Sequence, residues 1–83
     1  MYGEDFQLQM EEFEIEENSF LEKKQLKDSE IRQKSGAIVL AIRREHKLVI
    51  NPDPDYDMQK NDKLIVLGSF EQLKKMSTLV SSC

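Results

Sequence analysis

Three aspartates alternate along residues 51–64, NPDPDYDMQKNDKL, as they would in a calcium-binding loop. They are Asp53, Asp55 and Asp57. An EF-hand loop also requires glycine at its sixth position, for a sharp bend, and glutamate at its twelfth, for bidentate capture of the ion. Those positions hold Met58 and Leu64, and Pro54 stiffens the backbone that would have to wrap the ion. The segment therefore predicts a turn between two strands, with no metal ligand in it.

The acidic stretch at residues 11–17, EEFEIEE, is a second candidate for binding a cation. A hard cation needs several oxygens that converge on one point. Here Phe13 and Ile15 alternate with the glutamates, and a period of two is typical of a strand with one face in water. We interpret the stretch as the solvated face of a strand.

Catalytic residues are scarce, since the chain has one histidine, His46, and one cysteine, Cys83. The usual triads cannot be assembled from this set, and no GxGxxG, P-loop, CxxC, HExxH or GxSxG pattern occurs. The lone cysteine has no partner for an intrachain disulfide, which fits a reducing, cytoplasmic setting. The sequence predicts a protein that is not an enzyme.

Length and charge narrow the class of protein further. A chain of 83 residues is one small domain that buries roughly 60–65% of its unfolded surface, which favours self-association or a place within a longer polypeptide. The net charge of −4 opposes nonspecific attachment to nucleic acid or anionic lipid. The longest apolar run, residues 37–42, is far shorter than the roughly 20 residues that span a bilayer. We expect no nucleic-acid partner.

The elements that would position these side chains begin with an irregular segment. Residues 1–10 carry no clean period, and we interpret them as a lead-in or as a linker from a preceding domain, with the domain itself at residues 11–83. A strand follows at residues 11–18. A short helix is then predicted, with Asp28 as its N-cap and Gly36 at the left-handed position after its last turn.

The second half of the chain predicts three strands and a helix. Residues 37–44 are apolar without alternation, which is typical of a central strand buried on both faces. A tight reversal is predicted at residues 43–47, after which residues 48–51 return as a partner strand. A further strand is predicted at residues 63–68, and Ser69 with Gln72 forms a capping box that starts the last helix. The predicted order is β-α-β-β-β-α. This is an α+β fold, with a small mixed or antiparallel sheet of about four strands and two helices.

From about Glu12 to Val80 the chain resembles the C-terminal subdomain of the RCK (regulator of potassium conductance) or TrkA family, called TrkA_C. The features that carry the resemblance are 18-NSFLEKKQLKDSEIRQKSGAIVLAIRR-44, the turn 51-NPDPDY-56, the strand 62-DKLIVLG-68 and the helix 70-FEQLKKM-76. One departure is Asn61, where the family often has glycine; asparagine tolerates the positive φ that such a turn needs.

The resemblance implies a cytoplasmic regulatory domain that forms a homodimer, senses a small-molecule ligand and controls potassium transport. Its partner would be a bacterial or archaeal potassium channel or transporter, in the same chain or as a separate subunit, and the domain would lie at the cytoplasmic face of the membrane. The alternative is a structural dimerisation module of another membrane transporter, such as an antiporter, with no ligand of its own.

Some members of the family bind cyclic di-AMP through the pattern (I/L)(I/L)xxDxRxxxxxN(I/V). Leu26, Arg32 and Val39 match it, whereas Lys27, Glu30 and Ile38 depart from it. The ligand-binding residues that the resemblance implies are Leu26, Arg32, Ile38 and Val39. Arg32 would pair with a phosphate and Ile38 would contact an adenine face.

Two alternatives to this ligand site stay open. Arg32 can simply offset the dipole at the end of its helix, an effect worth about 0.3–1 kcal/mol at an exposed site. Other family members bind calcium through carboxylates, so calcium is the second candidate ligand, held where separate chains bring carboxylates together.

Overall fold

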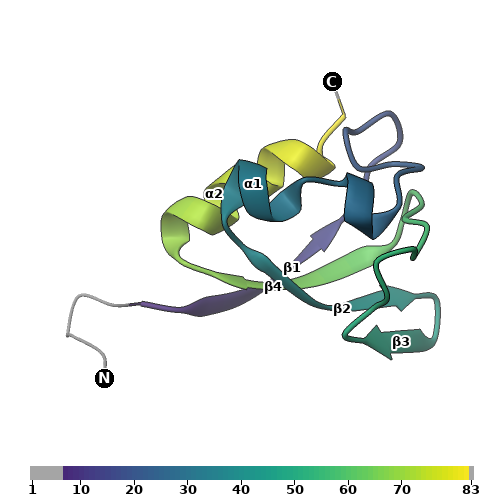
Figure 1. The fold of residues 1–83 in the computed structure, drawn as a ribbon, viewed down its shortest axis with the longest axis horizontal. Helices are drawn as coiled ribbons and strands as arrows, with labels where there is room; N and C mark the ends of the chain where they lie inside the picture. Colours follow the sequence, from purple (N-terminus) through teal and green to yellow (C-terminus); the bar gives the residue numbers. More distant parts are fainter. Residues whose placement is uncertain (1–6, 83) are drawn as a thin grey trace.

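Four antiparallel strands and two helices make up residues 7–82, the part of the 83-residue chain that this computed structural model describes (Figure 1). The strands are β1 (Gln9–Glu14), β2 (Ile38–Arg44), β3 (Lys47–Ile50) and β4 (Lys63–Gly68). The helices are α1 (Ile31–Ser35) and α2 (Phe70–Val80), and a single 3₁₀ turn, η1 (Leu26–Asp28), precedes α1. The predicted α+β fold and its order of elements are confirmed.

The sheet has the order β1-β4-β2-β3, and every pair in it is antiparallel. Strands β2 and β4 therefore lie in the middle, as the apolar run at residues 37–44 predicts. The pairing of β2 with β4 shifts register between Val39 and Ala41. A β-bulge of this kind bends a strand and increases its twist, and here it lies at the start of β2, next to α1.

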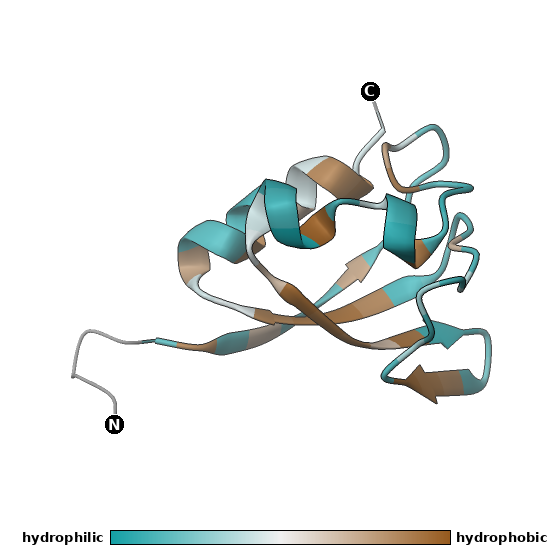
Figure 2. Ribbon diagram, viewed as in Figure 1, coloured by the Kyte–Doolittle hydropathy of each residue, from teal (hydrophilic) through white to brown (hydrophobic). Residues whose placement is uncertain are grey.

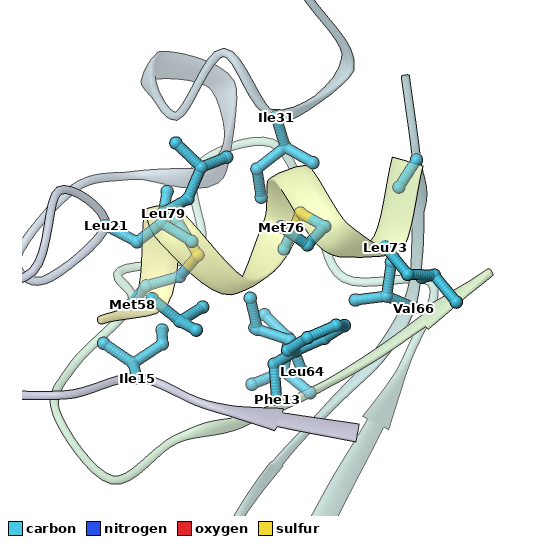
Figure 3. Close-up of a cluster of buried hydrophobic side chains, with 13 residues drawn as sticks. Phe13, Ile15, Leu21, Ile31, Met58, Leu64, Val66, Leu73, Met76 and Leu79 are labelled. Atoms are coloured by element: carbon cyan, nitrogen blue, oxygen red, sulfur yellow. The ribbon is translucent and has the colours of Figure 1, made fainter. Parts of the chain in front are cut away.

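Both helices pack on one face of the sheet (Figure 1), where α2 contacts β1 and β4 while α1 rests against α2. Figure 3 shows Leu73 and Met76 of α2 above Phe13 and Leu64 of the sheet. The side chains of Met76 and Leu64 are completely buried. Full burial of an aliphatic side chain contributes roughly 1.5–3 kcal/mol, so this layer is the main source of stability.

Helix α2 begins as predicted but presents a narrower apolar face. The Gln72 amide N–H donates to Ser69 Oγ (3.2 Å) and the Ser69 N–H donates to Gln72 Oε1 (2.9 Å), which confirms the capping box. Phe70 was expected on the same stripe as Leu79, but it is 62% exposed. Leu79 lies nine positions after Phe70, which is about two and a half turns of helix, so Phe70 lies on the opposite side.

Helix α1 ends as predicted and begins differently. Gly36 adopts φ +82° and its N–H donates to the carbonyl of Arg32, which confirms the glycine cap. The prediction that Asp28 is the N-cap is wrong, because Asp28 belongs to η1. The residue before α1 is Glu30, in the left-handed region at φ 57°, while Ser29 Oγ accepts the N–H of Ile31.

The other face of the sheet is open among residues 7–82, so the prediction that residues 37–44 are buried on both faces is wrong. Ile38 is 46% exposed and Ile50 is 73% exposed. Figure 2 shows β3 as an apolar strand at the edge of the sheet. Strand β1 starts at Gln9, inside the segment interpreted as a lead-in; residues 1–6 and Cys83 lie outside the described part.

Candidate functional site

A cleft of about 410 Å³ opens between α1 and the turn that follows β3. Its lining comes from η1, α1, the start of β2 and residues 51–54. Leu26, Arg32, Ile38 and Val39, the ligand-binding residues expected from the sequence, all line it. Three separate elements contribute these side chains, so the fold brings together residues that were grouped only by a sequence pattern.

Backbone hydrogen bonds hold the two walls of the cleft together at its base. The N–H of Lys27 donates to the carbonyl of Pro54 (2.7 Å), and the N–H of Leu26 donates to the carbonyl of Tyr56 (2.9 Å). An isolated bridge between Gln25 and Asp57 continues the pairing. The start of η1 thus uses its free N–H groups to fix the segment that follows β3, which determines the width of the cleft.

An ion pair between Asp62 and Arg44 fixes the far end of the segment that follows β3. The carboxylate of Asp62 is 2% exposed and accepts Nε and Nη2 of Arg44, each at 2.8 Å, and the N–H of Gln59 at 2.9 Å. Arg44 also donates to the carbonyl of Asp57 and lies 5.1 Å from the centroid of the Tyr56 ring. Residues 51–62 are therefore held by β2 as well as by η1.

This environment shifts the pKa of Arg44 and of Tyr56. The hydrogen bonds to Asp62 raise the pKa of Arg44 above its usual value, against an opposing effect of burial. Burial raises the pKa of the Tyr56 hydroxyl, and the nearby Asp62 carboxylate adds to the rise. Both groups keep their neutral-pH protonation states more firmly than they would in an unfolded chain.

The cleft has an apolar floor and a charged rim. Ile31 and Ala37 are buried at its base, together with Pro52. Lys27 and Arg32 are exposed on the helical side. An apolar surface beside guanidinium and ammonium groups is suited to a ligand that has a flat apolar part and an anionic part.

One polar lining group is already engaged within the protein. Ser29 is buried, and its Oγ donates to the carbonyl of Leu26 (2.7 Å) and accepts the N–H of Ile31. Glu30 forms an exposed ion pair with Lys34 on the next turn (3.6 Å). Four other polar side chains line the cleft and make no hydrogen bond or ion pair within residues 7–82: Lys27, Arg32, Gln33 and Asn51.

Asn51, Pro52 and Pro54 also line the cleft, although their residue types predicted only a turn. They lie at least 12 residues beyond Val39 in the chain. The β2–β3 hairpin folds them back onto the start of β2, where the Asn51 N–H donates to the carbonyl of Leu40 (2.7 Å). The predicted return of residues 48–51 alongside residues 37–44 is confirmed, and this pairing is the signal that could have placed Asn51 and the prolines beside the start of β2.

The other candidate residues lie apart from the cleft or on its outer edge. Asp53, Asp55 and Asp57 are exposed in the turn, and His46 is exposed in the β2–β3 hairpin. Within residues 7–82 no three His, Cys, Asp or Glu side chains come together as a metal site. Among the same residues, none of the helices has the length and apolar character to span a membrane.

Comparison with known proteins agrees with the family that the sequence resembles. The TrkA-C domain family model matches residues 10–81. The chain is 43% identical over 79 residues to "Probable potassium channel protein 2" of Methanocaldococcus jannaschii, which is 95% of this chain and 22% of the relative. The chain thus spans about a fifth of the length of that relative.

Solved structures share the fold. The RCK_C domain dimer of S. agalactiae BusR in complex with c-di-AMP has a TM-score of 0.80 at 23% identity, covering 88% of this chain and 90% of that one. The RCK C domain of the potassium transport protein KtrA, in complex with the same ligand, has a TM-score of 0.77 at 24% identity, with 84% and 80% coverage. BusR is also known in complex with its busAB-promotor DNA, where this chain covers 39% of the BusR chain.

These structural matches lie below 25% identity and establish the fold, whereas the family model covers nearly the whole described chain. The resemblance implied the observed elements, which are β1, the glycine-capped α1, the paired central strands and the capped α2. The chain belongs to the TrkA-C domain family.

Proposed function

We propose that this chain is a cytoplasmic, dimerising, ligand-sensing domain that regulates a potassium channel or transport system, and that its ligand is cyclic di-AMP. The observation that carries the proposal is the meeting of Leu26, Arg32, Ile38 and Val39 in one cleft. Two solved neighbours of the same fold are complexes with that ligand. Calcium ranks second, because within residues 7–82 the carboxylates of one copy do not converge as a set of metal ligands.

The charge of the cleft favours an anionic ligand. Its rim carries the cations of Lys27 and Arg32 and the carboxylate of Glu30, so each cleft has a net charge of about +1 in a protein whose total is −4. Two clefts that face each other would present two positive charges to the two phosphodiesters of a cyclic dinucleotide. Arg32 suits this role because its guanidinium can donate two parallel hydrogen bonds to one phosphate.

The size of the cleft supports a site shared by two copies. A volume of about 410 Å³ is near the lower end of the range for small-molecule pockets, and one wall is open to solvent. One cleft therefore suits half of a dinucleotide. A ligand with two-fold symmetry matches a protein dimer with two-fold symmetry, so each copy would hold one nucleotide.

Regulation would follow from this shared site. A ligand that touches both copies stabilises the relative orientation that it fits better, and it shifts the equilibrium only by its differential affinity for the two orientations. A pore or carrier attached to the dimer would respond to that change. The alternative, a purely structural dimerisation module, predicts the same dimer with no response to any ligand.

The location and the partner are part of the proposal. The match to a potassium channel relative supports attachment to the cytoplasmic face of a membrane transport protein, in the same chain or as a separate subunit. The absence of a nucleic-acid partner remains a prediction from the net charge of −4. DNA binding by BusR belongs to a chain that is more than twice as long as this one.

Thermal unfolding of the purified 83-residue chain with a ligand panel tests the proposal. The panel contains cyclic di-AMP, cyclic di-GMP, AMP and calcium chloride. At a cyclic di-AMP concentration 100 times its Kd, binding adds about 2.7 kcal/mol to the stability of the folded state. A domain of this size would then unfold roughly 10–20 °C higher.

The matched variants are Arg32→Ala and Arg43→Ala. Arg43 lies on the open face of the sheet, pairs with Glu12 and does not line the cleft. We expect Arg32→Ala to abolish the shift with cyclic di-AMP and Arg43→Ala to retain it. A dimer by light scattering that shows no shift with any ligand at 1 mM would contradict ligand sensing and support the structural alternative.

A further inference from the structure

Asn51 has an unusual place in the cleft, because a neutral amide stands beside the apolar floor on a rigid backbone. Its φ of 53° is in the left-handed region, and its N–H is bonded to the carbonyl of Leu40 (2.7 Å). Leu40 is the residue at which β2 shifts register, directly after the lining residue Val39. Asn51 is exposed and lines the cleft at the end of β3, whereas Arg32 lines it from α1.

Two neutral amides line the cleft, Gln33 on the helical side and Asn51 on the strand side. The helical side also supplies the charges of Lys27, Glu30 and Arg32, and the floor supplies hydrocarbon, so Asn51 is the polar side chain next to the strands. The amide of Asn51 has one acceptor and two donors and carries no charge. Within residues 7–82 this amide makes no hydrogen bond to another protein group, so all of its polar atoms can face a ligand.

An amide of this kind recognises adenine. Its carbonyl accepts the N6 amino group while its NH₂ donates to N7, a bidentate pairing that guanine cannot form because O6 replaces the amino group. We infer that Asn51 is the base-reading residue of the cleft and gives it a preference for adenine over guanine, while Arg32 takes the phosphate. This inference rests on the proposed function and assigns its specificity to a side chain outside the helical segment.

The test compares the affinities for cyclic di-AMP and cyclic di-GMP, by calorimetry on the full chain. Asn51→Gly is the informative variant, because glycine retains the positive φ and removes only the amide. Asn51→Asp is the second variant, since it keeps an acceptor for N6 and loses the donor to N7. Gln33→Ala is the matched control, because Gln33 is the other amide of the cleft and lies on the charged, helical side.

We expect wild type and Gln33→Ala to prefer cyclic di-AMP by roughly tenfold or more, and Asn51→Gly to lose most of that preference. Asn51→Asp should lie between them. If the wild-type chain binds cyclic di-AMP and Asn51→Gly keeps the same preference, the inference is overturned while the proposed function stands. If the wild-type chain binds neither dinucleotide, the proposed function fails and the inference fails with it.

Discussion

Replacement of Asp62 by alanine should destabilise the protein far more than replacement of any other carboxylate in an ion pair described above. The Asp62 carboxylate is 2% exposed and accepts three hydrogen bonds, two of them from the Arg44 guanidinium. Removal of one partner of a fully buried pair costs about 3–5 kcal/mol, because a charge is left unpaired in a medium of low polarity. Exposed pairs contribute only about 0–1 kcal/mol.

The cost of breaking the pair of Asp62 with Arg44 should lie between these two values, because only Asp62 is buried. The Arg44 side chain is 38% exposed, so after the substitution its charge can regain water, while the Gln59 N–H loses its acceptor. This N–H is only partly buried, so the loss of its acceptor should cost toward the lower end of the roughly 1–3 kcal/mol of an unsatisfied buried donor. We therefore expect Asp62→Ala to lower the free energy of unfolding by about 2–3 kcal/mol. That is a large part of the roughly 4–12 kcal/mol typical of a domain of this length.

Urea unfolding at a fixed protein concentration measures this change, since self-association would otherwise shift the midpoint. The matched control is Glu12→Ala, which breaks the half-exposed pair with Arg43 and should cost less than about 1 kcal/mol. A loss below 1 kcal/mol for Asp62→Ala, equal to that of the control, would refute the reasoning. The assignment of Asp62 as the brace of residues 51–62 would then be wrong.

The remaining predictions concern pH, a backbone cap and the core. Folding raises the pKa of Tyr56, so the contribution of this group to stability is complete below its unfolded pKa of about 10 and is lost as the pH rises through the folded pKa. The urea midpoint of the wild type should therefore fall above pH 10, and Tyr56→Phe should remove that part of the decline. Gly36→Ala should cost about 1–2 kcal/mol, because φ is +82° and the added Cβ would lie 2.8 Å from Nε2 of Gln72; a loss below 0.5 kcal/mol in the same urea assay would show that the cap relaxes freely. Met76→Ala should cost roughly 2–5 kcal/mol through the cavity that it leaves, and a change in the urea midpoint no larger than that of a surface variant would contradict the assignment of this residue to the core.

The sequence predicted features that depend on local chemistry. The capping box of Ser69 with Gln72 and the left-handed cap at Gly36 each involve groups within four residues, so the sequence contains the whole interaction. The order of strands and helices followed from periodicity for the same reason. The start of α1 was missed because two capping residues compete there, and Ser29 rather than Asp28 accepts the N–H of Ile31.

The features that the sequence did not predict depend on contacts between distant parts of the chain. Residues 37–44 are buried on a single face because both helices lie on the same side of the sheet, and Ile38 is therefore exposed. The ion pair of Arg44 with Asp62 joins two of many charged residues across 18 positions. The return of β3 alongside β2, which carries Asn51 to the cleft, was predicted, but the hydrogen bonds that hold the following residues against η1 were not. A pattern shared with a family identified one wall of the cleft, and the hairpin supplied the other.

The central claim is that two copies of the chain hold one small anionic ligand between their clefts. Titration calorimetry with cyclic di-AMP measures this directly through the stoichiometry. We predict one ligand bound for every two chains in the wild type, and no measurable heat for Arg32→Ala. Saturation at one ligand for each chain, or no binding by a wild-type chain that is folded and dimeric, would contradict the account.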